Sequence, residues 1–87
     1  MKKGTGMSAF NDRYNLLLNK ARQAMRCGHC AWAVQSTGEK IAVALVLNRA
    51  DWLEELGYTL AEAVERIGQD WVAVITQVAH QLAKEGV

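Results

Sequence analysis

The chain contains no proline, and only two cysteines and two serines occur among its 87 residues. Both serines, Ser8 and Ser36, stand where a structural role is expected, so hydrolysis by a serine nucleophile has little support. The longest apolar run, residues 41–47, is far shorter than the roughly 20 residues of a membrane span. No apolar segment follows the basic start Met1–Lys3, so we expect no signal peptide, no membrane association and a cytoplasmic protein.

Hydrophobic residues make up 51% of the chain, which is enough for a packed core. A chain of this length fits one domain. Residues 1–7 lack a periodic pattern and are interpreted as a flexible tail, which leaves residues 8–87 as the domain.

Helical periodicity marks the first element. Ser8 is the expected N-cap and Gly28 the expected terminator. Between them runs one apolar stripe at helical spacing: Phe10, Tyr14, Leu17, Leu18, Ala21 and Met25.

Residues 30–35 and 40–47 favour two strands, joined by a turn at residues 36–39. One face of this hairpin would hold Cys30, Trp32, Val34, Ile41, Val43, Leu45 and Leu47. The other face would hold mostly alanine, so both faces need cover. An isolated hairpin is marginally stable and its apolar edge is exposed, which predicts a homodimer with a four-stranded sheet. A monomer whose helices wrap the hairpin is the alternative.

The remaining chain predicts three helices. Asn48 caps the first, which covers residues 51–56, and Asp70 caps the last. Thr59 and Glu62 form a capping box for the middle helix, which ends at Gly68 and is expected to bury Leu60, Ala63, Val64 and Ile67. The predicted fold class is therefore α+β, with the order α-β-β-α-α-α.

Charge is divided between the two halves of the chain. Residues 1–49 hold eight Lys/Arg and two Asp/Glu, a net charge of +6, and residues 50–87 hold two against seven, a net charge of −5. Such blocks complement each other within one fold or face separate partners. In the first case, the basic first helix lies near the acidic segment 51–65 of the same chain.

The leading hypothesis is a non-catalytic accessory or regulatory protein that binds a protein partner through a charged helical surface. Its acidic residues are Asp51, Glu54, Glu55, Glu62 and Glu65. The alternative is a nucleic-acid-binding module that contacts phosphates through Lys2, Lys3, Arg13, Lys20, Arg22 and Arg26. We expect no cofactor, and the three tryptophans, Trp32, Trp52 and Trp71, are interpreted as core residues.

The string Cys27-Gly28-His29-Cys30 is the most chemically distinctive part of the chain. It is similar to the CGHC site of protein disulfide isomerases, where the first thiol lies at a helix N-terminus. Here the motif follows a predicted helix and precedes a predicted strand, and there is no proline, so that family is not assigned. Two thiols also supply half of a zinc site, to which His29 could add a ligand or a second chain its own pair. Two ordinary reduced thiols, with Cys30 buried beside Trp32, are the third interpretation.

Overall fold

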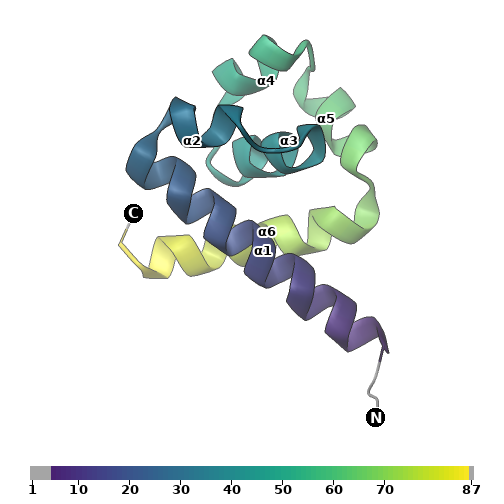
Figure 1. The fold of residues 1–87 in the computed structure, drawn as a ribbon. Coiled ribbons are helices and arrows are strands. Elements are labelled where there is room, and N and C mark those ends of the chain that lie inside the picture. The colour runs from purple at the N-terminus through teal and green to yellow at the C-terminus, as the bar shows by residue number, and fades with distance from the viewer. Residues whose placement is uncertain (1–4, 87) are drawn as a thin grey trace.

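The structure is a computed structural model that describes residues 5–86, and within that range it contains six α-helices and no strand (Figure 1). The helices are α1 (Thr5–Cys27), α2 (His29–Ala33), α3 (Thr37–Val46), α4 (Ala50–Leu56), α5 (Leu60–Ile67) and α6 (Gln69–Lys84). The predicted α+β fold with its hairpin is therefore wrong. α1 begins before the predicted cap Ser8, and residues 1–4 of the predicted tail lie outside the described residues.

α3 is the centre of the fold, because it contacts each of the other five helices. Four successive residues, Ile41, Ala42, Val43 and Ala44, are buried. Successive helical residues point about 100° apart, so four of them cover most of the helix circumference. A helix buried on every side reads as apolar at every position. A run of this kind has no period that separates a buried helix from a buried strand, which explains the error over residues 40–47.

The segment that was expected to form the hairpin turn instead starts α3. The Ser36 hydroxyl accepts a hydrogen bond from the backbone amide of Glu39 at 3.3 Å, and the Glu39 carboxylate accepts one from the Ser36 amide at 3.2 Å. This is a capping box, the same motif that the sequence shows at Thr59 and Glu62.

The predicted first strand, residues 30–35, forms most of α2 and a turn. The Trp32 indole is fully buried, and its N–H donates to the backbone carbonyl of Lys40 at 2.8 Å. Val34, expected inside the hairpin, is 85% exposed. The segment therefore anchors Trp32 in the core and exposes Val34 to solvent, whereas Gln35 after it is buried again.

The other five helices surround α3 (Figure 1). α1 and α6 cross and pack together, while α4 and α5 contact each other on another side of α3. None of the helices between residues 5 and 86 is both long and apolar enough to cross a bilayer.

The three predicted C-terminal helices are confirmed, with differences at their ends and faces. α4 begins after Arg49 rather than Asn48, which has a left-handed φ of 57°, and Gly68 rather than Asp70 precedes α6. α6 buries Val74, Val78 and Leu82 as expected. On α5, only Ala63 of the predicted stripe is fully buried.

Candidate functional site

Ion pairs link the two oppositely charged halves of the chain. Arg13 on α1 lies 3.8 Å from Asp70 at the start of α6. Arg22 of α1 pairs with Glu85, which follows α6, and its Nε donates to Oε1 at 3.2 Å. The opposite charges therefore meet within one molecule, as one of the two interpretations expected. The helix nearest to the basic α1 is α6, however, and not the acidic segment 51–65.

Glu85 is the carboxylate most strongly perturbed by these contacts. Hydrogen bonds from Arg22 and from Gln81 stabilise its charged form and lower its pKa to about 2. Arg22 in turn has its pKa raised by the same pair. This contact links the C-terminal end of α6 to the C-terminal third of α1.

Three of the five predicted acidic surface residues already have partners. Asp51 accepts two hydrogen bonds from Arg49, at 3.0 and 2.8 Å, and this contact lowers the pKa of Asp51. Glu62 completes the capping box of α5, accepting from the Thr59 amide at 3.0 Å. Glu55 pairs with His29.

The other two acidic residues, Glu54 and Glu65, are exposed and form no ion pair with any residue that the structure describes. The predicted acidic surface is therefore divided. α4 contributes mostly paired carboxylates, and α5 contributes Glu65 together with Glu62.

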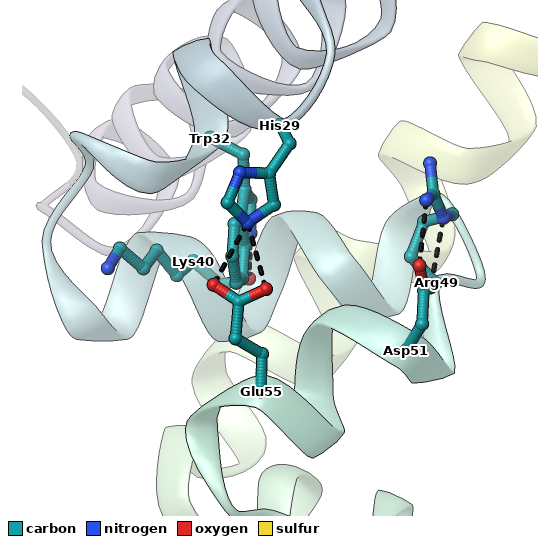
Figure 2. A network of polar contacts seen from close by, with 6 residues as sticks. All are labelled: His29, Trp32, Lys40, Arg49, Asp51 and Glu55. Atoms are coloured by element: carbon teal, nitrogen blue, oxygen red, sulfur yellow. Dashed lines mark hydrogen bonds and ion pairs between the residues drawn. The ribbon is translucent and has the colours of Figure 1, made fainter.

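An aromatic and charged cluster joins α2 to α4 (Figure 2). The rings of Trp32 and Trp52 stack with centroids 4.8 Å apart, and the His29 ring lies 5.3 Å from that of Trp32. His29 Nε2 lies 2.9 Å from both carboxylate oxygens of Glu55. Both tryptophans are buried, which confirms two of the three predicted core assignments.

Two cations cover the outside of this tryptophan pair. The Arg49 guanidinium lies 4.2 Å from the Trp52 ring centroid, and the Lys40 ammonium lies 5.4 Å from that of Trp32. Cation–π contacts at partly exposed positions contribute about 0.5–1 kcal/mol each, so the cluster has a clear structural role. The third tryptophan, Trp71, is only half-buried and lies 5.9 Å from the Arg13 guanidinium.

The cysteine motif lies between two helices, not between a helix and a strand. Cys27 is the last residue of α1 and Cys30 lies in α2, and both are free and exposed. Burial of Cys30 beside Trp32 is therefore wrong. Among residues 5–86, no three His, Cys, Asp or Glu side chains are grouped as a metal site would require. Among the described residues of one chain, the hydrogen-bond partner of the His29 ring is the Glu55 carboxylate.

The predicted basic residues do not form one surface. Arg13 and Arg22 face carboxylates of the same chain, and Lys20 is half-buried, with its backbone carbonyl accepting from the side-chain amide of Gln35 at 3.4 Å. Arg26 is exposed, while Lys2 and Lys3 lie outside the described residues. Nucleic-acid binding stays a prediction, and the pairing of two arginines reduces the positive charge available to phosphates.

Exposed apolar side chains on α5 are the feature that the sequence did not predict. Leu60 is 55% exposed and Val64 is 44% exposed, although both belong to the stripe that was expected to be buried. Helical spacing defines which residues share a face, but it does not show how much of that face the rest of the fold covers.

A cavity of about 460 Å³ lies where the C-terminal ends of α1, α3 and α6 approach one another. Its lining is mostly small or apolar: Ala24, Met25, Gly28, Val46, Leu47, Trp52, Ala79, Leu82 and Ala83, with Arg49 as the charged member. A lining of this composition offers shape and apolar contact but no acid–base pair.

In comparisons with protein-family models, with curated proteins and with solved structures, nothing matches this chain, so its function has to be argued from its own residues.

Proposed function

We propose that the chain is a non-catalytic interaction protein that binds a protein partner through the outer face of α5. We call this face the α5 surface and define it by Leu60, Ala61, Glu62, Val64 and Glu65. The observation that carries the proposal is the exposure of Leu60 and Val64 on a short helix that is otherwise firmly placed by its capping box and by buried Ala63.

The two apolar residues are neighbours in space. Residues four apart on a helix lie one above the other on the same face, so Leu60 and Val64 present one continuous apolar strip. Single exposed apolar residues are common on protein surfaces, but an adjacent pair marks a candidate contact. Covering the exposed parts of both side chains would contribute roughly 2 kcal/mol at about 25 cal/mol per Å².

Charge beside the strip indicates what kind of partner would fit. Around the helix circumference, Ala61 lies between Val64 and Glu65, and Glu62 follows, so the apolar strip passes directly into a negative one. Residues 50–87 as a whole carry a net charge of −5. A partner with apolar side chains next to Lys or Arg would match both strips, and the charges would speed its association at low salt.

The structure removes the reason for which a homodimer was predicted. It depended on the open edge of a hairpin, and residues 5–86 contain no strand. If a second copy is the partner, the contact surface would be the α5 surface, and the same experiment detects it.

Site-specific photo-crosslinking tests the proposal. A photoreactive amino acid is placed at position 64 and, as a matched control, at position 34, where Val34 is also apolar and exposed but lies between α2 and α3. We expect position 64 to crosslink one defined protein, and position 34 to crosslink none. Equal crosslinking from both positions, or none from position 64, would reject the α5 surface.

The partner identified by crosslinking is then purified, and its binding to variants of the chain distinguishes a specific contact from non-specific hydrophobic adsorption. We expect the double variant L60S/V64S to weaken binding by at least tenfold, which corresponds to about 1.4 kcal/mol. The variant V34S should bind as the unaltered chain does. The charge reversal E65K should weaken binding more at low salt than at high salt, and equal effects at both would remove the electrostatic part of the proposal.

A further inference from the structure

Cys27 and Cys30 lie on either side of a sharp bend in the backbone at Gly28, which we call the cysteine corner. Cys27 closes α1, Cys30 lies in α2, and Gly28 between them has φ 75° and ψ −153°. Both thiols are free and exposed. Nothing in the proposed binding role of α5 uses them.

The corner brings the two residues within reach of each other. The dihedral angles of Gly28 lie near those of the first central position of a type II′ turn, where a positive φ favours glycine. Four residues that bend in this way keep their first and fourth Cα atoms less than about 7 Å apart, and from the Gly28 angles we infer the same for Cys27 and Cys30. Disulfides span Cα separations of about 4.4–6.8 Å, so closing one needs little movement of the backbone.

Contacts beneath the corner hold it in place. His29, inside the motif, is tied to Glu55 of α4 at 2.9 Å, and Trp32 is fully buried with its indole N–H bonded to the Lys40 carbonyl. Figure 2 shows the His29 ring directed to Glu55 beside Trp32. The side chains that anchor the segment therefore point into α4 and the core, while both thiols stay accessible.

We propose that Cys27 and Cys30 form a dithiol–disulfide site that exchanges with low-molecular-mass disulfides of the glutathione type. One cysteine thiolate attacks a sulfur of oxidised glutathione, breaks its S–S bond and releases one glutathione thiolate. The second cysteine thiolate then attacks the protein sulfur of this mixed disulfide and releases the other glutathione. The two protein thiols are oxidised, one glutathione disulfide is reduced to two thiols, and the two protons pass to the released thiolates or to water.

A zinc site is the competing use of the same thiols, and the structure favours it less. Two thiolates supply half of a tetrahedral set, and residues 5–86 show no third ligand grouped with them. A site shared by two copies would still block the thiols, so the test below distinguishes the two chemistries.

The test uses the reduced full-length chain, equilibrated in buffers with different ratios of reduced to oxidised glutathione. The samples are quenched in acid, alkylated and measured as intact masses. We expect a monomer that has lost two hydrogen atoms and takes up no alkylating reagent. The variants C27S and C30S should each stop at a mixed disulfide with one glutathione.

Three outcomes would overturn the proposal. The first is an unaltered chain that carries one or two glutathiones instead of an internal disulfide. The second is a product dominated by disulfide-linked dimers. The third is a chain that stays unoxidised in every glutathione buffer and whose mass, measured under native conditions without the acid quench, includes zinc.

Substitution of Gly28 tests the role of the corner. A Cβ at this position meets no atom within 4 Å, but the positive φ strains any other L-residue. We expect G28A to lower, by up to about tenfold, the ratio of the squared concentration of reduced glutathione to the concentration of oxidised glutathione at which half of the chain is oxidised. The matched variant G38A, at an exposed helical glycine, should leave that ratio unchanged. Equal ratios for G28A and the unaltered chain would show that the turn does not bring the thiols together.

Discussion

Replacing Gly38 by alanine distinguishes the helix from the predicted hairpin by the sign of its effect on stability. Gly38 lies in the first turn of α3 with an ordinary negative φ, and an added Cβ would meet no atom within 4 Å. Alanine restricts the unfolded chain more than glycine does, so G38A should stabilise the protein. For a helical glycine the gain is about 0.5–1 kcal/mol, and we expect the lower end because the position is close to the helix start.

Gly57 provides the opposite control. It ends α4 in the left-handed region with φ 84°, and an added Cβ would again meet no atom within 4 Å. The difference between the two sites is therefore one of backbone conformation, not of space. G57A should destabilise the protein by about 1–2 kcal/mol, the cost of the left-handed conformation for an L-residue.

Urea unfolding followed by far-ultraviolet circular dichroism measures both free energies of unfolding. In thermal unfolding, 0.5 kcal/mol corresponds to a rise in Tm of roughly 2–4 °C for a domain of this size. If residues 36–39 were a hairpin turn, Gly38 would be favoured by a positive φ and G38A would lower the stability as G57A does. A loss of 1 kcal/mol or more in G38A would therefore refute the assignment of α3.

Two further perturbations test the core and the charge pairing. W32F removes the hydrogen bond to the Lys40 carbonyl and leaves a void against Trp52. We therefore expect the free energy of unfolding in urea to fall by about 2–3 kcal/mol. A decrease below about 0.5 kcal/mol would show that the indole is not held as described. The pKa of Glu85 is lowered from 4.5 to about 2 by Arg22 and Gln81, so its folded form binds fewer protons than its unfolded form in that range. The stability it adds is present above pH 4.5 and is lost as the pH falls toward 2. The unaltered chain should therefore lose more stability over this range than E85Q, and parallel losses would contradict the pairing.

Two signals identified helices in the sequence: the period of the apolar residues and, for α5, a correct start signal as well. Thr59 with Glu62 marked the start of α5, and the spacing of Val74, Val78 and Leu82 marked the buried face of α6. Ser36 and Glu39 form the same capping motif, but the apolar run after them favoured strands. A start signal depends only on neighbouring residues in the sequence. The apolar residues of α3 show no helical period because five helices surround it, and those helices come from distant parts of the chain.

Only those features of the candidate sites that depend on neighbouring residues in the sequence could be predicted. The spacing of Cys27 and Cys30 is visible in the sequence, but their exposure depends on α2 being a helix. The pairing of Arg13 with Asp70 depends on α1 crossing α6. The exposure of Leu60 and Val64 depends on how little of α5 its neighbours cover.

The contact of α3 with every other helix has a consequence for how the protein opens. Amide hydrogens exchange with solvent through local fraying, partial opening or complete unfolding. The amides that exchange most slowly do so only through complete unfolding. Residues 41–44 are buried among five surrounding helices, so their amides are shielded from water in the folded chain. Their exchange should therefore measure the free energy of the whole fold, and no stable substructure that lacks α3 should accumulate. We therefore expect the described helices to unfold together as one cooperative unit.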